Sequence, residues 1–296
     1  MVVEPIAARP ESLGVLPRPK AGRRSGACAS SPTRAALARA RAQALVADPA
    51  EALSPAARPA ILARMTVFPR ARDPDVFPPS VAQFSVTIPA GAAPPGVDGV
   101  HLPKALERAV PKRRAQFLAG RICAGGAIAR LAPGFAGAVA RDPDGLPLWP
   151  AGLVGSISHT DGFATAAVAR AGDAFGLGVD VERVMSRETA TEIASMIASA
   201  SERRLVSDLL RLDAREALTL VFSAKESLFK ALFPSMRKHF DHLDCGVSRL
   251  DPEARRFVLR FRPPFDAAFG AAEFDGRFEL ADGEVRTGVL VSPTPQ

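Results

Sequence analysis

Four polar side chains recur at helical spacing inside an otherwise apolar stretch of the sequence. Residues 221–232 are strong helix formers without Gly or Pro, and Pro234 follows, so they predict a helix that ends before this proline. Because the polar positions fall at i, i+3, i+4 and i+7, they share one face of that helix. An ion pair at this spacing on a solvated surface is worth about 0.2–0.5 kcal/mol, but the apolar flanks leave little other polar surface, which favours a functional role. The four side chains are Ser223, Glu226, Ser227 and Lys230.

Two acidic side chains alternate along a second apolar segment. Residues 176–184 predict a strand in which Asp180 and Glu182 point to one face, while the valines beside them point to the other. Neighbouring carboxylates raise each other's proton affinity, and a cation between them removes the conflict. Such oxygen ligands suit Mg²⁺, which keeps several waters and binds one or two carboxylates plus substrate phosphate. The alternative is a solvated edge strand in which Glu182 pairs with Arg183 or Arg187.

Basic side chains that could bind phosphate lie earlier in the chain. Residues 104–131 predict a helical stretch on which Arg114 and Arg121 share a face, with Arg113 roughly 100° away. Arg can bind phosphate through two parallel hydrogen bonds, although a solvated basic face is the alternative. His159 ends a short predicted strand and opens a polar loop. It is therefore a candidate base or phosphate contact, or a structural histidine.

The elements that must position these residues mix helices and strands along the chain. A strand at 81–88 precedes the helical stretch with the arginines, and a strand–turn–strand hairpin at 155–169 precedes the acidic strand. A helical region at 187–212 leads into the central helix. Four further strands follow near 244–250, 255–262, 273–280 and 285–292. This order predicts an α+β fold.

Composition sets the first residues apart from the rest of the chain. Residues 1–64 hold ten basic and four acidic side chains, a net of +6 out of the chain's +7, and no aromatic residue. A segment without large apolar groups cannot offset its chain entropy by burial. We expect 1–64 to be a disordered Ala/Arg/Pro-rich extension, or the product of a mis-assigned start with translation beginning at Met65. The alternatives are a targeting segment and a nucleic-acid-binding arm.

Cysteine usage and hydropathy indicate the compartment. Three cysteines without paired spacing fit a reducing interior and argue against a disulfide framework or a zinc site. No run of 18 apolar residues predicts a membrane span, and the first residues lack the charged-then-apolar order of a secretory signal. We therefore expect a cytoplasmic protein.

Taken in order, these motifs resemble those of the 4′-phosphopantetheinyl transferases, in particular the enterobactin-synthetase-component-D type within the Sfp-like group. The resemblance runs from about residue 66 to about residue 290 and leaves the N-terminal extension without a counterpart. It rests on five motifs: Lys112-Arg-Arg-x-x-Phe-Leu-Ala-Gly-Arg121, Leu146-Pro-Leu-Trp-Pro150, Gly155-Ser-Ile-Ser-His159, Gly178-Val-Asp-Val-Glu182 and Phe222-Ser-Ala-Lys-Glu-Ser-x-Phe-Lys230.

The resemblance implies an α+β fold in which two similar halves pack about a pseudo-twofold axis, with the active site in the cleft between them. We place the boundary near residue 175. Residues 65–175 would then form the half that binds the 3′-phosphate of coenzyme A, and residues 176–296 the half that binds Mg²⁺ and carries out catalysis.

The family's reaction moves 4′-phosphopantetheine from coenzyme A to a serine of an apo acyl or peptidyl carrier protein and releases adenosine 3′,5′-bisphosphate. By resemblance, Asp180, Glu182 and Glu226 are the ligands of Mg²⁺. Glu226 also accepts the serine proton, directly or through a water, and Lys230 faces the phosphate that gains charge. The residues implied to bind coenzyme A are Arg113, Arg121, Ser158, His159, Lys225 and Lys230.

Two positions depart from the family pattern. Gln116 stands where relatives usually carry Glu, which would weaken an ion pair that supports the arginines. Asp144 stands where some relatives carry Lys, so one phosphate contact would be missing.

Two other functions compete with the transferase interpretation. They are a Mg²⁺-dependent phosphatase or nucleotide hydrolase that uses the same carboxylates, and a basic nucleic-acid-binding protein. Under the transferase interpretation we expect a monomer that binds no nucleic acid, spans no membrane and serves siderophore, nonribosomal peptide or polyketide synthesis.

Overall fold

The computed structural model describes residues 68–70, 72–89, 102–135, 138–263, 265 and 273–293. All of them fall within one of the two units into which the chain divides, Glu51–Gln296. The predictions for residues 1–64 and for a start at Met65 lie outside the described residues. None of the described helices is long and apolar enough to cross a membrane.

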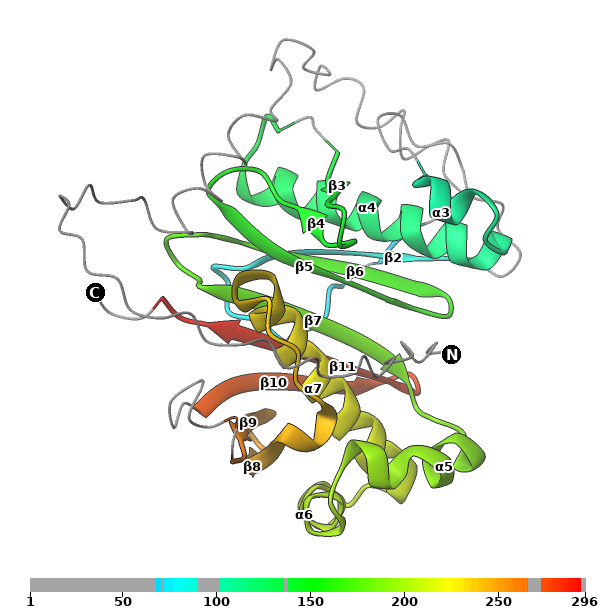
Figure 1. Ribbon diagram of the computed structural model, residues 1–296, viewed down its shortest axis with the longest axis vertical. Helices are drawn as coiled ribbons and strands as arrows, with labels where there is room; N and C mark the ends of the chain where they lie inside the picture. Colours follow the sequence, from blue (N-terminus) through cyan, green and yellow to red (C-terminus); the bar gives the residue numbers. More distant parts are fainter. Residues whose placement is uncertain are drawn as a thin grey trace, which may run out of the picture. The chain divides into compact units, whose positions relative to one another are not determined.

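The first sheet is antiparallel and has the strand order β1-β2-β6-β5. It forms around the predicted hairpin, in which small side chains of β6 allow a helix to approach closely. Ala164, Ala166 and Val168 of β6 are buried against Ala119 and Ala127 of α4. Helix α4 lies along this sheet (Figure 1). The elements are β1 (Phe68–Pro69), β2 (Ala82–Thr87), α3 (Lys104–Glu107), α4 (Pro111–Leu131), β5 (Leu153–Thr160) and β6 (Phe163–Arg170), with a small hairpin of β3 (Ala140–Arg141) and β4 (Pro147–Leu148) before β5.

The second sheet is also antiparallel, in the order β7-β11-β10-β9-β8. The long helix α7 lies across β7 and β11 (Figure 1). Asp213 caps α7 in a capping box with Glu216, and α5 and α6 pack on its outer side. The elements are β7 (Gly176–Arg183), α5 (Arg187–Ile197), α6 (Ala200–Leu210), α7 (Ala214–Met236), the 3₁₀ turn η1 (His242–Asp244), β8 (Cys245–Asp251), β9 (Arg256–Phe261), β10 (Glu273–Ala281) and β11 (Glu284–Val291).

Side-chain hydroxyls connect the two sheets. Strands β5 and β7 belong to different sheets, yet Ser156 Oγ accepts the Val179 N–H at 3.0 Å and Ser158 Oγ accepts the Val181 N–H at 3.2 Å. Both serines are buried, so these bonds satisfy backbone groups that water does not reach. We call this contact the β5–β7 seam.

The predicted α+β class is confirmed, and so are most of the elements. The prediction that the central helix ends before Pro234 is wrong, because α7 runs to Met236 and includes this proline in its last turn. A proline there removes one backbone donor, and the helix still closes with Arg237 N–H donating to Phe233 O at 2.8 Å. The pseudo-twofold relation of two halves stays a prediction.

Candidate active site

The most buried of the predicted acidic residues, Asp180, lies at the centre of a hydrogen-bonded group formed by three elements. Ser158 Oγ of β5 donates to its Oδ1 at 3.0 Å, and Ser223 Oγ of α7 donates to its Oδ2 at 2.7 Å. Lys230 Nζ, two turns along α7, lies 2.5 Å from Oδ1 and 3.1 Å from Ser158 Oγ. The structure thus brings together Asp180, Ser158 and Lys230, which are far apart in sequence.

Two glycines of β7 explain how α7 comes close enough. A Cβ built on Gly178 would lie 1.8 Å from Ser227 O, and one on Gly176 would lie 2.2 Å from Ala231 O. The helix backbone therefore rests directly on these positions. The polar stripe faces the sheet, where Ser223 and Ser227 Oγ lie 2.9 and 2.6 Å from Thr287 Oγ1 of β11. Lys230 follows on the same stripe and reaches Asp180.

The other two predicted carboxylates act on this group through their charge. Burial raises the pKa of Glu182 to about 8, and the carboxylates of Asp180 and Glu226 add to the shift while Lys230 opposes it. Burial also acts to raise the pKa of Glu226, but the hydrogen bond from His242 and the charge of Lys230 outweigh it and lower that pKa. Burial opposes the charged form of Lys230 as well, yet Asp180 and then Glu226 raise its pKa.

The residues present fit a divalent cation in ligand type and in charge. Asp180 pairs with Lys230, and the carboxylates of Glu226 and Glu182 also act on this ammonium through their charge, so three carboxylates share one cation. Their side chains are not arranged in advance around one point, since no group of three His, Cys, Asp or Glu side chains among the described residues has that geometry. Lys230 pairs instead with Asp180, one of the predicted ligands.

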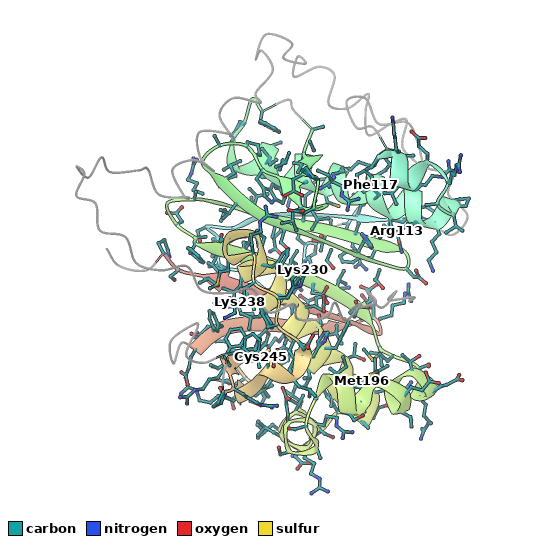
Figure 2. All side chains as sticks on the ribbon, in the orientation of Figure 1. Arg113, Phe117, Met196, Lys230, Lys238 and Cys245 are labelled. Atoms are coloured by element: carbon teal, nitrogen blue, oxygen red, sulfur yellow. The ribbon has the colours of Figure 1, made fainter. Side chains whose placement is uncertain are left out.

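A second predicted group, of basic residues, lies where the start of α4 meets the β5–β6 turn (Figure 2). Arg113 Nη1 lies 2.8 Å from His159 Nε2. Burial lowers the pKa of His159 to about 4, and the charges of Arg113 and Lys230 add to the shift. Because a guanidinium only donates, Nε2 accepts this bond and the neutral ring carries its proton on Nδ1.

Arg121 is buried further along α4 and has no carboxylate partner among the residues that the structure describes. Its guanidinium lies over the Phe117 ring at 4.8 Å from the centroid, and its Nε has no hydrogen-bond partner there. Burial lowers the pKa of Arg121 to about 10, and the charge of Arg141 adds to the shift. A buried cation beside a second cation favours an anion as its partner.

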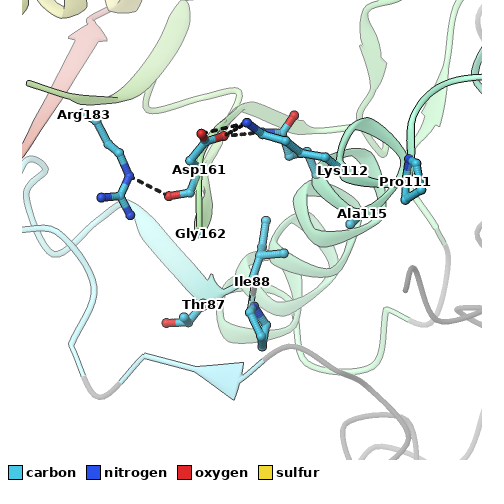
Figure 3. A pocket seen from close by; sticks show the side chains of 10 residues that line it. Thr87, Ile88, Pro111, Lys112, Ala115, Asp161, Gly162 and Arg183 are labelled. Atoms are coloured by element: carbon cyan, nitrogen blue, oxygen red, sulfur yellow. Dashed lines mark hydrogen bonds and ion pairs between the residues drawn. The ribbon is translucent and has the colours of Figure 1, made fainter. Parts of the chain in front are cut away.

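A cavity of about 610 Å³ adjoins the basic group (Figure 3). Its wall includes Lys112, whose Nζ lies 2.6 Å from Asp161 Oδ1, and Arg183, whose Nε donates to Asp161 O at 2.9 Å. Lys112 is the sequence neighbour of Arg113, and Arg183 is that of Glu182, so the lining includes a direct neighbour of one residue in each predicted group. Its lining does not include Asp180 or Lys230.

The structure does not bring Lys225 to this site, which differs from the phosphate contact expected for it. Its side chain is only 1% exposed, and Nζ donates to Ile197 O at 2.8 Å, His242 O at 2.8 Å and Glu202 Oε2 at 3.0 Å. These acceptors use all three ammonium protons. Position 225 is about 100° around the helix from Glu226, and it faces α6 and η1 rather than β7.

The two departures from the family pattern make contacts of their own. Gln116 Nε2 lies 3.5 Å from both Thr160 O and Asp161 Oδ1, so an amide stands beside the β5–β6 turn. Asp144 accepts from Arg237 Nη1 at 2.7 Å, which ties the β3–β4 turn to the residue after α7.

One residue of the site was not predicted. His242 Nε2 lies 2.9 Å from Glu226 Oε1. It follows Glu226 by 16 residues, at the start of the short 3₁₀ turn η1, and no spacing in the sequence marks it.

Comparison with known proteins agrees with the motifs. A family model described as the 4′-phosphopantetheinyl transferase N-terminal domain matches residues 102–169, and one described as the 4′-phosphopantetheinyl transferase superfamily matches residues 176–280. The 4′-phosphopantetheinyl transferase Svp of Streptomyces mobaraensis is 38% identical over 193 residues, which cover 62% of this chain and 75% of the relative.

Two other relatives cover the chain differently. Enterobactin synthase component D of Salmonella typhimurium is 43% identical over 130 residues, 43% of this chain and 51% of the relative. The match therefore spans about half the length of that relative. The 4′-phosphopantetheinyl transferase Npt of Nocardia iowensis is 28% identical over 194 residues, 62% of this chain and 85% of the relative. The chain belongs to the 4′-phosphopantetheinyl transferase superfamily, whose members take phosphopantetheine from coenzyme A and attach it to carrier proteins.

Proposed function

We propose that this transferase modifies a serine of an apo acyl or peptidyl carrier protein with Mg²⁺ held by Asp180, Glu182 and Glu226. The observation that carries the proposal is the convergence of strand β5, strand β7 and helix α7 on Asp180 and Lys230. Two further carboxylates act on the same point through their charge. Phosphoryl transfer needs such a concentration of charged groups, because catalysis consists mostly of positioning and of stabilising charge.

Each residue has a distinct task in the proposed reaction. The carrier serine forms a new P–O bond to the phosphate of the phosphopantetheine arm, and the bond to adenosine 3′,5′-bisphosphate breaks. Glu226, with its lowered pKa, is ionised at neutral pH and accepts the serine proton. Lys230 neutralises charge that develops on the phosphate oxygens, and Ser158 helps to hold it. When bound, Mg²⁺ would neutralise the pyrophosphate and polarise its P–O bonds.

The basic residues of the first sheet and α4 are proposed to hold the 3′-phosphate of coenzyme A. Arg113 is an exposed donor beside His159, and both side chains lie at the start of α4 and the β5–β6 turn. Arg121 is a buried guanidinium without a carboxylate partner among the described residues. We also propose that residues 65–175 and 176–296 act as a coenzyme-binding half and a catalytic half.

The names of the relatives indicate which carrier proteins to test first. Because several are enterobactin synthase components, we propose carriers of siderophore or nonribosomal peptide synthesis as the first partners to test, and polyketide carriers after them. We propose that the protein is cytoplasmic, since coenzyme A and carrier proteins are soluble substrates. We also propose that it acts as a monomer.

The test is mass spectrometry of a panel of apo-carrier proteins incubated with coenzyme A and Mg²⁺. The expected result is the addition of one phosphopantetheine group to one serine, with loss of the reaction in Asp180→Ala and Glu226→Gln. Both variants should keep the wild-type circular dichroism spectrum. Full turnover in both would refute the assigned metal and base residues. Release of adenosine 3′,5′-bisphosphate without any carrier would instead indicate hydrolysis.

A further inference from the structure

The turn that leads into β8 places an imidazole against the proposed catalytic base. His242 Nε2 lies 2.9 Å from Glu226 Oε1, and both side chains are about 30% exposed. Among the described residues, the second oxygen of Glu226 has no hydrogen-bond partner. The carboxylate is therefore held at one oxygen and open at the other.

The imidazole ring itself is held by stacking. Its centroid lies 5.2 Å from that of Phe222, and the two planes differ by 21°. Phe222 precedes Glu226 by one helical turn, so the ring lies along α7 with its Nε2 at the level of the carboxylate. A stacked ring has fewer rotamers available, which fixes the direction of the hydrogen bond.

The backbone of the turn is fixed by neighbours outside it. Lys225 Nζ donates to His242 O at 2.8 Å, and Arg262 donates to Leu243 O from Nη1 at 3.2 Å and to Asp244 O from its backbone N–H at 2.7 Å. Asp244 Oδ2 accepts the Asp241 N–H at 2.6 Å, which closes the turn on itself. Lys225 thus acts on the site indirectly, by anchoring the segment that carries the imidazole.

The contact between His242 and Glu226 opposes an ion pair that the spacing of Glu226 and Lys230 on α7 would favour. Glu226 and Lys230 are four residues apart, the spacing at which a carboxylate and an ammonium usually pair. They do not form an ion pair here: Lys230 pairs with Asp180, and Glu226 pairs with His242. Without the imidazole, the Glu226 carboxylate could turn toward Lys230, and both groups would be withdrawn from their proposed tasks.

We propose that His242 is a positioning residue of the transfer reaction, which holds Glu226 Oε1 and so keeps the carboxylate apart from Lys230 with Oε2 free to act. The inference rests on the proposed role of Glu226. It assigns no contact between His242 and coenzyme A or the carrier protein.

Two substitutions separate the hydrogen bond from the stacking. His242→Phe keeps an aromatic ring on Phe222 and removes the donor, whereas His242→Gln removes the ring and places an amide N–H near the position of Nε2. We expect His242→Phe to lower kcat about 10- to 100-fold, the range typical for residues that orient a metal ligand, with the KM for coenzyme A unchanged. His242→Gln should restore most of kcat.

A binding measurement gives a second readout. Calorimetric titration of Mg²⁺ into the enzyme with coenzyme A present should show weaker binding in His242→Phe than in the wild type. The same substitution should have no further effect on Mg²⁺ binding in a Glu226→Gln background, where the carboxylate is gone. Thermal unfolding of each variant reports whether the fold is kept.

The outcomes separate this inference from the proposed function. Wild-type kcat and Mg²⁺ affinity in His242→Phe would overturn the positioning role, as would a folded His242→Gln that is no more active than His242→Phe. In either case an inactive Glu226→Gln would leave the proposed function standing. Full activity of Glu226→Gln would overturn both.

Discussion

At the scale of single residues, two lysines five positions apart on α7 have opposite surroundings. Lys230 Nζ reaches Asp180 at the centre of the site, while Lys225 is enclosed by carbonyl oxygens and Glu202. Burial lowers the pKa of Lys225 even though Glu202 opposes the shift. An ammonium with all its protons donated to buried protein acceptors cannot also bind substrate phosphate, so Lys225 contributes to stability and to the anchoring of His242.

The substitution Lys225→Met should therefore act on stability. Removing one member of a buried ion pair leaves Glu202 partly uncompensated, and we expect a loss of about 3 kcal/mol in the free energy of unfolding. Lys112→Met is the matched control, because the Lys112–Asp161 pair is exposed and should be worth no more than about 1 kcal/mol. Guanidinium chloride unfolding of both variants measures the difference. Equal losses would show that burial of the Lys225–Glu202 pair has no energetic consequence.

His159 should make the stability of the protein depend on pH in the acidic range. His159 has a pKa of about 4 in the folded protein, because of burial and of the charges of Arg113 and Lys230, against about 6.5 in an unfolded chain. Between these values the unfolded chain binds more protons, so the free energy of unfolding falls as the pH drops from about 6.5 toward 4. Above about pH 7.5 the ring is neutral in both states and contributes no pH dependence.

The variant His159→Gln lacks this titration and should lose less stability on acidification. The difference between wild type and variant should change by about 1 kcal/mol between pH 7.5 and pH 5, after allowance for the partial exposure of the ring. Urea unfolding at a series of pH values measures it. Parallel curves for the two proteins would mean that His159 titrates normally in the folded state.

The periodicity of strand and helix could place Asp180 with Glu182, and Glu226 with Lys230, on shared faces. It could not show which side of α7 near position 225 is covered, since α6 and η1 come from other parts of the chain. It could not reveal His242 for the same reason: a loop residue has no periodicity, and only the fixed path of the turn brings it to Glu226.

At the scale of elements, the packing of α7 on β7 sets the geometry of the site. Strand β7 carries glycine at positions 176 and 178, on the same side as Asp180, and the helix backbone fills the space that side chains would take. The separation of helix and strand is therefore set by backbone contact. This close approach lets the Lys230 side chain end at Asp180.

The substitution Gly178→Ala tests this contact. Its Cβ would meet Ser227 O at 1.8 Å, and backbone atoms cannot move aside as a flexible side chain can, so we expect a loss of about 3 kcal/mol. The fraction that stays folded should also turn over more slowly, because α7 and Lys230 are displaced from Asp180. Gly172→Ala is the control: its Cβ has no neighbour within 4 Å, and stability should be unchanged or slightly higher. Thermal unfolding and specific activity are measured together, and a Gly178→Ala variant that matches the control would refute the backbone-contact model.

Most helices and strands could be predicted from local sequence patterns. The residues at which they end, and the interruptions within a helical region, could not. The helical region predicted at 187–212 is two helices, because Ala198 is extended and Ser199 caps α6 by accepting the Glu202 N–H. A Ser followed three residues later by Glu is a helix-start signal inside an otherwise continuous helical pattern. The end of α7 shows the limit of a proline as a stop signal when it lies in the last turn.

At the scale of the whole described unit, the reaction centre depends on the β5–β7 seam. The two sheets do not share a backbone ladder at this point, and their register is set by Ser156 and Ser158 of β5, which accept the N–H groups of Val179 and Val181 of β7. The α+β class could be predicted from the order of elements. This seam could not, because serines at alternate strand positions are equally typical of a solvated face.

The two serines of the seam allow structure and chemistry to be separated in matched variants. Ser156→Ala and Ser158→Ala each leave one buried N–H without its acceptor, so each should lose about 1–3 kcal/mol of stability. Only Ser158 also contacts Asp180 Oδ1 and Lys230 Nζ, and so only its loss should disturb the reaction centre. We expect wild-type kcat in folded Ser156→Ala and a kcat at least about tenfold lower in Ser158→Ala. Unfolding curves test the expected loss of stability, and kcat with one chosen carrier protein tests the expected loss of activity. Both are measured on the same preparations. If the two variants lose kcat equally, the seam affects the site only through the spacing of the sheets, and Ser158 has no separate part in positioning Lys230.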